Sequence, residues 1–249
     1  MANLESRPQT RSPLFMPLAG GAMLLLGAGL GWAVASRGDG GPAGDFDSRV
    51  HNYIVTHPEV LVEAADQLKS RGSERQLAEI ADQVVKPFPG AVLGNPNGTV
   101  TLVEFTDFAC SYCRGSVADV EALVAASPDL RVVVRELPII APTSADAARW
   151  GLAAAEQGKY PAFHKAMFAA GRTDPASVAA AARAAGLDLE RARKMIADPK
   201  VNAEIASNLE FARKLQISGT PSWIAGKRLI IGAVGREALA QALVAARGS

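Results

Sequence analysis

The chain has 249 residues, of which 49% are hydrophobic and 20% charged, so it holds enough apolar material for one large or two small domains. Its formal net charge of +1 gives no electrostatic footprint for nucleic-acid binding, and none for a strongly acidic partner. Any function therefore rests on individual sites rather than on bulk charge.

The N-terminal part, residues 1–36, predicts a cytoplasmic tail followed by a membrane segment. Residues 14–36 carry no ionisable side chain and are long enough to span a bilayer, while Arg7 and Arg11 before them favour a cytoplasmic N-terminus. Because the apolar run is longer than a usual signal core, we favour an uncleaved anchor; the Ala-Val-Ala sequence at 33–35 leaves a cleaved signal peptide as the alternative. Either fate exports the remaining chain to an oxidising, periplasmic or extracytoplasmic compartment, at the cytoplasmic (inner) membrane if the anchor stays.

Residues 37–45 are rich in glycine and predict a flexible linker, and residues 46–85 predict a separate helical segment. Within that segment, His57-Pro58 starts a new helix and Gly72-Ser73 is expected to break it. Helices this short cannot bury their apolar stripes alone. They are expected either to dock on the main domain or to pack against the same segment of another chain, which would make a homo-oligomer through residues 46–85.

The main domain, residues 86–249, predicts an α/β fold. A short strand after Val92 and a central strand after Val100 precede a helix and a second buried strand at 130–136, and this β-α-β order makes the last two strands parallel neighbours. Residues 143–215 are almost wholly helical. Their expected helix starts are a capping box at Thr143 and Asp146, and caps at Asp174, Asp188 and Asp198. A hairpin at 222–225 and 228–231 and a helix at 235–246 close the domain.

Two cysteines, Cys110 and Cys113, stand at the junction of the central strand and its following helix. Unpaired N–H groups and the positive end of the helix dipole favour a thiolate at the first cysteine, and the second lies one turn on, close enough to form a disulfide with it. Such a pair exchanges electrons with thiols of another protein through a mixed disulfide.

Two other interpretations of the cysteine pair are weaker. A structural zinc site needs four ligands, whereas the chain has these two cysteines and three histidines, His51, His57 and His164, without zinc-ligand spacing. His164, between phenylalanines, is expected to be a packing residue. A structural disulfide would close a very short loop and constrain the unfolded chain little. The residues therefore favour redox chemistry.

Near the C-terminus, Gly219-Thr220-Pro221 precedes a strand, and a proline there is a candidate for a cis peptide bond. Together with Phe-x-Asp-x-x-Cys-x-x-Cys, the helical insertion and an Ile-Gly-Ala hairpin, this pattern resembles the DsbA-like family of thioredoxin-fold thiol:disulfide oxidoreductases, from about Ala91 to the C-terminus. The His57-Pro-Glu-Val-Leu61 stretch further resembles the segment that precedes the catalytic domain in ScsC-like, copper-sensitivity-suppressor members.

The resemblance implies roles for individual residues. Cys110 would be the exposed nucleophile and Cys113 the shielded resolving thiol, with the pair as a redox-active disulfide. Thr220 and Pro221 would form the cis-proline loop that holds a substrate peptide by its backbone. Glu104, six residues before the first cysteine, would be a buried acid that relays a proton to or from Cys113, the alternative being a surface glutamate at a strand end.

Ser111 and Tyr112, between the cysteines, would tune the thiolate and face the substrate. They depart from the Pro-His dipeptide of strongly oxidising members and are more similar to isomerase and ScsC-type members, which leaves the direction of electron flow open. The resemblance implies an enzyme that forms, reduces or isomerises disulfides in exported proteins, without a cofactor or metal, and that is recycled by a membrane redox partner. The alternative is a protective module that holds Cu(I) on two thiolates.

Overall fold

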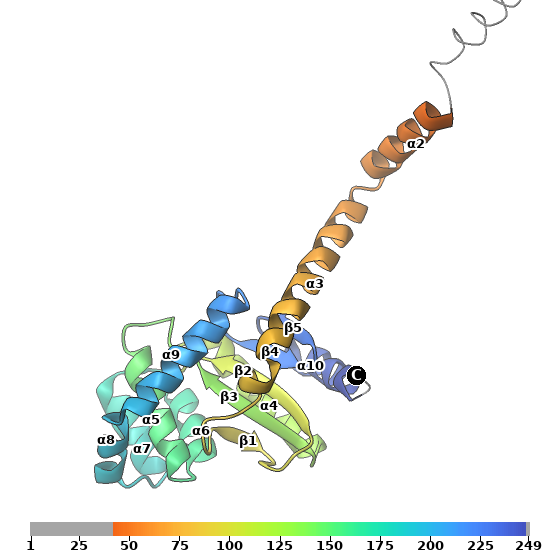
Figure 1. The fold of residues 1–249 in the computed structure, drawn as a ribbon. Coiled ribbons are helices and arrows are strands. Elements are labelled where there is room, and N and C mark those ends of the chain that lie inside the picture. The colour runs from red at the N-terminus through yellow and green to blue at the C-terminus, as the bar shows by residue number, and fades with distance from the viewer. Residues whose placement is uncertain (1–41, 248–249) are drawn as a thin grey trace, which may run out of the picture. The chain divides into compact units, whose positions relative to one another are not determined.

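The computed structural model describes residues 42–247, with the side chains of 45–65, 67–68 and 71–247 (Figure 1). The chain divides into two units between Ala65 and Asp66. The predicted anchor or signal segment at 14–36 lies outside the described residues. Within 42–247, the structure contains no helix whose length and apolar character would allow it to cross a membrane.

The first unit contains helix α2, Pro42–Thr56, and the start of α3, Glu59–Val84, so the predicted helix start after His57-Pro58 is confirmed. The ring of Tyr53 stacks on that of His57, with ring centroids 4.4 Å apart. Several large apolar side chains are exposed along this unit: Phe46, Val50, Tyr53, Val55, Leu61 and Val62. The first unit, taken by itself, therefore has an apolar surface.

Helix α3 passes through Gly72-Ser73 without interruption, so the predicted break there is wrong. One glycine disfavours a helix by only about 1 kcal/mol relative to alanine, which good helix formers on both sides offset. The last turns of α3 also pack against the sheet, because Leu77, Ile80 and Val84 are buried in one cluster with sheet residues such as Phe105. These turns thus belong to the second unit, although the sequence placed them in a segment ending at 85.

A five-stranded sheet forms the centre of the second unit, in the order β1-β3-β2-β4-β5. Strands β2 and β3 run parallel, and every other neighbouring pair is antiparallel. The strand bounds are β1 Val92–Gly94, β2 Val100–Thr106, β3 Leu130–Glu136, β4 Ser222–Ala225 and β5 Arg228–Ile231. This arrangement confirms the predicted α/β, thioredoxin-like fold.

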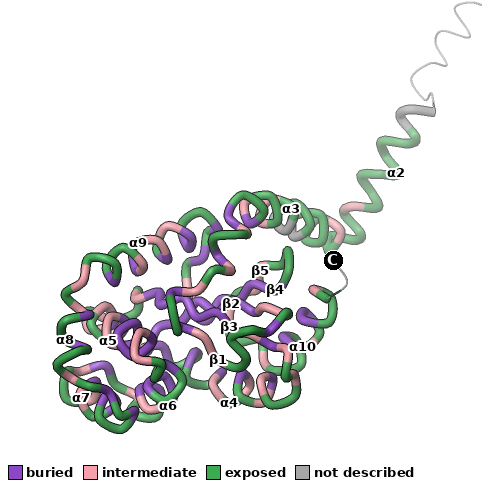
Figure 2. The backbone as a smooth tube through the Cα atoms, turned by 60° about the horizontal axis from the view of Figure 1, so that its bottom comes forward, coloured by how far each residue is buried: buried purple, intermediate pink, exposed green. Residues whose placement is uncertain are grey.

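Helices cover both faces of the sheet, whose central strands are buried along their length (Figure 2). One face packs against α4, α10 and the helices α5 to α8, and the other against α9 and the end of α3. The helix bounds are α4 Ser111–Ala126, α5 Ser144–Glu156, α6 Tyr160–Ala170, α7 Pro175–Ala184, α8 Leu189–Ile196, α9 Pro199–Lys214 and α10 Gly235–Ala246. The helical block between β3 and β4 accordingly runs from 144 to 214.

The predicted caps at Asp174, Asp188 and Asp198 are confirmed, because each carboxylate accepts a hydrogen bond from the first turn of its helix. The predicted capping box at Thr143 is wrong. Thr143 has helical backbone angles, and its hydroxyl forms a 2.6 Å hydrogen bond with that of Thr173 instead. A cap needs extended backbone at this position, which the loop after β3 does not provide.

Alternation along β2 and β3 determines which side chains meet the helix that carries the cysteines. Leu102 and Val132 lie in the cluster packed against α4, whereas Val103 and Val133 lie in the cluster on the opposite face. Since side chains alternate along a strand, Glu104 and Glu136 share the α4 face. The sheet thus presents two carboxyl groups to the face on which the cysteines lie.

Candidate active site

Cys110 is the N-cap residue of α4, with extended backbone angles, and Cys113 lies in the first helical turn. The backbone N–H of Cys110 donates to the carbonyl of Asp107 at 2.9 Å, and its carbonyl accepts from the N–H of Arg114 at 3.1 Å. The predicted strand-to-helix junction is confirmed. The first N–H groups of a helix lack intrahelical partners, so the Cys110 side chain lies at the positive end of the α4 dipole.

Both cysteines are free thiols and both are buried: Cys110 is 5% exposed and Cys113 is fully covered. The expectation that Cys110 is exposed is therefore wrong. The loop before β4 covers its sulfur, and the thiol donates a hydrogen bond to the carbonyl of Thr220 at 3.2 Å, although the two residues are 110 positions apart. The Thr220–Pro221 peptide bond in this loop is cis.

Burial raises the pKa of the Cys113 thiol to about 12. The nearby Thr106 and Thr220 hydroxyls and the backbone of Asp107 lower this pKa, and the charge of Glu104 raises it further. Cys113 thus keeps its proton at neutral pH unless a neighbouring base removes it.

Glu104 lies close enough to Cys113 for its charge to affect that thiol. It is 2% exposed, which excludes the alternative of a surface glutamate, and it faces Trp223 across the antiparallel β2–β4 pair. Burial raises the pKa of its carboxyl to about 8, with a smaller opposing contribution from Thr106. Its Oε2 atom is buried without a hydrogen-bond partner.

The remaining predicted site residues border the cysteines. Ser111 and Tyr112 lie in the first turn of α4 and are exposed, Tyr112 at 69%. Thr220 and Pro221 are buried, and the Thr220 hydroxyl acts on the Cys113 thiol without forming a well-aligned hydrogen bond. Cys110 thus adjoins exposed side chains in the chain and contacts the loop with the cis peptide bond through its sulfur.

Asp107 is the acidic residue of the Phe-x-Asp-x-x-Cys motif, three positions before Cys110. Its buried carboxylate accepts three backbone N–H groups, from Ala109 at 2.9 Å and from Ile139 and Ile140 at 2.8 Å each. It thereby ties the turn before Cys110 to the loop after β3. The signal that could have found it is an acidic residue inside an otherwise apolar run.

The sequence analysis also missed a second buried acid, Glu136, the last residue of β3. It is 1% exposed, and the hydroxyl of fully buried Tyr160 donates to its Oε1 atom at 2.7 Å. Burial raises the pKa of Glu136 well above its usual value; the Tyr160 hydrogen bond opposes this, and the charges of Asp107 and Glu104 add to it. No local pattern links these two residues, which lie 24 positions apart.

His164 is a packing residue, as predicted. It is buried, its ring packs against those of Phe108, Phe168 and Tyr160, and burial lowers its pKa to about 4. Among residues 42–247, three or more histidine, cysteine, aspartate or glutamate side chains nowhere gather in a way that could hold a metal ion.

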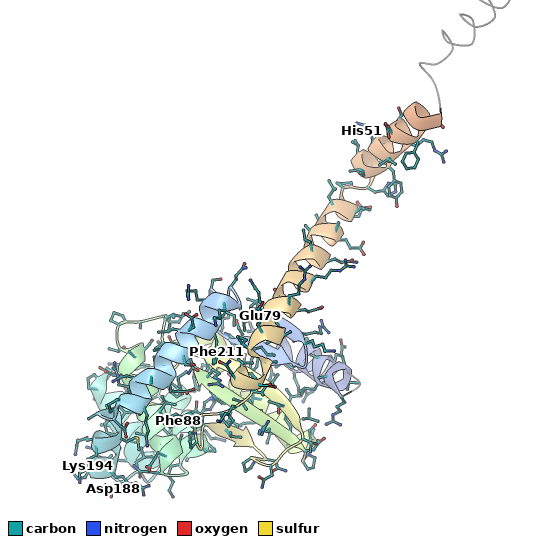
Figure 3. The ribbon with its side chains drawn as sticks, in the orientation of Figure 1. His51, Glu79, Phe88, Asp188, Lys194 and Phe211 are labelled. Carbon is teal, nitrogen blue, oxygen red and sulfur yellow. The ribbon has the colours of Figure 1, made fainter. Side chains whose placement is uncertain are left out.

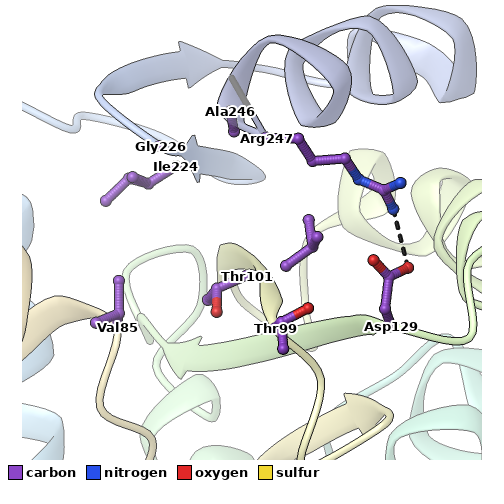
Figure 4. A pocket seen from close by; sticks show the side chains of 9 residues that line it. Val85, Thr99, Thr101, Asp129, Ile224, Gly226, Ala246 and Arg247 are labelled. Atoms are coloured by element: carbon purple, nitrogen blue, oxygen red, sulfur yellow. Dashed lines mark hydrogen bonds and ion pairs between the residues drawn. The ribbon is translucent and has the colours of Figure 1, made fainter. Parts of the chain in front are cut away.

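A cleft of about 460 Å³ lies at the opposite end of β2 from the cysteines (Figure 4). Residues 99–101 at the start of that strand line it, together with the β4–β5 turn. Arg247 and Asp129 form an ion pair of 2.9 Å beside it. The cleft contains none of the predicted site residues, so it is separate from the thiol chemistry.

The match to known families covers both units. Residues 101–244 match the family described as DSBA-like thioredoxin domain, and residues 45–74 match the one described as copper resistance protein ScsC N-terminal domain. A solved structure of a thioredoxin-like oxidoreductase from Silicibacter pomeroyi DSS-3 is 42% identical, with a TM-score of 0.64, and covers 68% of this chain and 98% of its own. Proteus mirabilis ScsC in a compact conformation is 26% identical, with a TM-score of 0.59, covering 77% and 99%.

Among curated proteins, the chain is 33% identical over 168 residues to Na(+)/H(+) antiporter NhaA 3 of Salinispora tropica. The match covers 66% of this chain and 26% of the antiporter. The chain spans about a quarter of the length of the curated relatives it matches.

Proposed function

This chain belongs to the DSBA-like thioredoxin domain family, and on that premise we propose that it catalyses thiol–disulfide exchange on exported proteins through Cys110 and Cys113. One observation carries the proposal. A thiol at the N-terminus of α4 lies one helical turn from a second, fully buried thiol, which shares its sheet face with a carboxyl whose pKa is raised to about 8.

The exchange proceeds in two steps. The Cys110 thiolate attacks a substrate disulfide, a mixed disulfide forms, and one substrate thiolate leaves. Cys113 then gives its proton to the Glu104 carboxylate and attacks the Cys110 sulfur, which releases the second substrate thiolate and leaves the Cys110–Cys113 disulfide. The substrate has gained two electrons and the pair has lost them; the reverse sequence oxidises a substrate dithiol. A carboxyl with a pKa of about 8 suits this proton transfer near neutral pH.

The loop opposite the cysteines supports a role in substrate binding. Because the Thr220 carbonyl already accepts the Cys110 thiol, a peptide joined to that sulfur lies beside the backbone of the loop with the cis peptide bond. We assign Thr220 and Pro221 to backbone binding of the peptide and exposed Ser111 and Tyr112 to contacts with its side chains.

Loss of turnover on substitution of the nucleophile tests the proposal. The wild-type chain should reduce insulin and regain activity from scrambled ribonuclease, Cys110→Ser should do neither, and Cys113→Ser should accumulate a mixed disulfide. Turnover by Cys110→Ser equal to that of wild type would contradict the proposal.

The direction of exchange and the partners extend the proposal. We place the active unit in the periplasm or another extracytoplasmic space, held at the inner membrane through residues 14–36 and recycled by a membrane redox partner. The equilibrium potential of the cysteine pair against glutathione distinguishes the directions. A value of about −120 mV would mark a donor of disulfides, and one of about −270 mV would mark a reductant.

The exposed apolar side chains of the first unit favour a homo-oligomer through residues 46–85, which would suit isomerase work by paired active sites. The mass of residues 46–249 in solution tests this, and a monomer at all concentrations would contradict it.

The match of residues 45–74 to a copper-resistance domain favours one second function, protection by Cu(I) binding on the two thiolates. In that case Cu(I) titration should saturate at one ion per Cys110–Cys113 pair, and the chain should show no turnover of insulin.

A further inference from the structure

The proposed proton transfer leaves one buried acid unused. Glu136 lies on the same sheet face as Glu104, one strand over and two residues further along, since Glu104 pairs with Val134 and Thr106 pairs with Glu136. With neighbouring strands about 4.8 Å apart and a rise of about 3.3 Å per residue, such diagonal neighbours lie about 8 Å apart at the backbone, within reach of long side chains. The carboxyls of Glu104 and Glu136 therefore face one buried region.

The structure holds the Glu136 carboxyl on two sides. The Tyr160 hydroxyl, at the start of α6, donates to its Oε1 atom at 2.7 Å. On α5, a Cβ added at Gly151 would lie 2.9 Å from the same oxygen, so the absence of a side chain there makes the space that the carboxyl fills. A buried polar side chain held this closely by two helices is a built feature rather than a chance contact.

The hydrogen bonds also determine which oxygen carries the proton when Glu136 is neutral. Because Tyr160 donates to Oε1, the acid proton belongs on Oε2. That atom is buried without a partner, and so is the Oε2 atom of Glu104. A donor and an acceptor thus lie on neighbouring strands, both unpaired.

Resting on the proposed function, we propose that Glu136 is a positioning residue. It stays protonated, donates a hydrogen bond toward the Glu104 carboxylate, and so makes Glu104 a base for Cys113 at a lower pH than burial alone would permit. The bond forms through rotation of the two side chains or through one water molecule.

The charges around Glu136 are consistent with its holding the proton. Burial disfavours the ionised form of Glu104. The ionised form of Glu136 is disfavoured by burial and also by the negative charges of Asp107 and Glu104. Two carboxyls that share a buried region do not ionise together, so the acid with the larger penalty keeps its proton.

The other titratable groups around Glu136 lie in the loop before α4, on α6 and on α4. The Asp107 carboxylate accepts hydrogen bonds from three backbone N–H groups. Burial raises the pKa of Tyr160 and lowers that of His164, so both side chains stay neutral. Cys113 is itself the proton donor. Glu104 and Cys113 are therefore the groups whose ionisation changes during the reaction.

Ellman's reagent separates the two steps in the full chain, in mild detergent. Attack by Cys110 releases the first coloured thiolate and leaves a mixed disulfide; attack by Cys113 on the Cys110 sulfur releases the second. The rate of the second phase should rise with pH as Glu104 ionises. In Glu136→Met, which cannot donate a hydrogen bond, the pH midpoint of that rise should move up by about one pH unit. At pH values below the midpoint, the second phase should then be about tenfold slower than in the wild-type chain. The first phase should keep its pH dependence.

Two further variants distinguish hydrogen bonding from packing. Glu136→Gln keeps an acceptor for Tyr160 and a donor toward Glu104, so it should restore the wild-type midpoint. Tyr160→Phe leaves the carboxyl in place without its orienting donor and should give a smaller shift in the same direction. An unchanged midpoint in Glu136→Met, or an equal shift in Glu136→Gln, would overturn the inference. A wild-type chain that releases no second thiolate would instead overturn the proposed function.

Discussion

Arg135 and Glu136 are neighbours in β3, and both are almost completely buried, but they lie on opposite faces of the sheet. The guanidinium of Arg135 has all its nitrogens occupied. It donates to the carboxylate of Glu204 at 2.7 Å, to the side chain of Asn208, and to backbone carbonyls at the end of α3 and just after it. The guanidinium carbon also lies 5.2 Å from the ring centroid of Phe211, a residue of α9 (Figure 3).

Around Glu136, on the opposite face of the sheet, several buried polar atoms lack hydrogen-bond partners. Glu104, Thr106, Glu136 and Thr220 each have one buried oxygen without a partner. A fully satisfied buried charge holds a structure in one arrangement, whereas unpaired oxygens leave protons free to move. We infer that the hydrogen-bond network of Arg135 stabilises the domain and that the unpaired oxygens around Glu136 serve its chemistry.

The strongest test of this contrast is Arg135→Met. This substitution leaves the Glu204 carboxylate and several carbonyls around the end of α3 without their hydrogen-bond donor. Breaking a buried ion pair in this way destabilises a protein by about 3–5 kcal/mol. Chemical denaturation should show this loss, while the second phase with Ellman's reagent keeps its pH dependence in the protein that remains folded.

The matched control is Lys165→Met. Its ion pair with Glu121 has a similar length, 2.9 Å, but the lysine side chain is 70% exposed. Such a pair contributes about 1 kcal/mol or less. If the two variants lost the same free energy of unfolding, the buried ion pair would stabilise the domain no more than the exposed one.

Glu104→Gln should have the opposite effect on stability. The folded-state pKa of about 8 lies above the model-peptide value of 4.5, so between these pH values the folded chain binds more protons than the unfolded chain, and stability falls as pH rises. Removing the acid should therefore stabilise the domain by about 3 kcal/mol at pH 7 and by nothing below pH 4.5.

The same variant should slow the second phase with Ellman's reagent by about 100-fold, since a general base contributes about 10²–10⁴. Denaturation midpoints measured from pH 4 to pH 8 check the stability, with Glu121→Gln, which removes a half-exposed carboxyl on α4, as the matched surface control. If Glu104→Gln were less stable than the wild-type chain at pH 7, burial of the Glu104 carboxyl would not destabilise the folded state.

Much of the fold was readable from the sequence because its signals are local. The hairpin strands at 222–225 and 228–231 were predicted with their bounds from the Gly226-Lys227 turn, and the caps at Asp174, Asp188 and Asp198 from the residues themselves. The cysteine pair at a strand-to-helix junction is local in the same sense.

What the sequence did not reveal depends on packing between distant segments. The burial of Cys110 comes from a loop at Thr220, and the pairing of Glu136 with Tyr160 comes from the docking of α6 over β3. The unbroken α3 depends on its last turns packing against the sheet. No residue pattern near these positions encodes their partners.

The smallest predicted effect concerns the space around Glu136. In Gly151→Ala the new Cβ would lie 2.9 Å from the carboxyl oxygen and 3.1 Å from the ring of Phe108, and overpacking of this kind destabilises by about 1–3 kcal/mol. Gly115→Ala, on α4 with nothing within 4 Å of the new Cβ, should instead stabilise by about 0.5–1 kcal/mol. Thermal unfolding of both variants compares the two positions. If both substitutions stabilised the domain, the Glu136 carboxyl would not be confined by α5, and its unpaired oxygen would be free to turn away from Glu104.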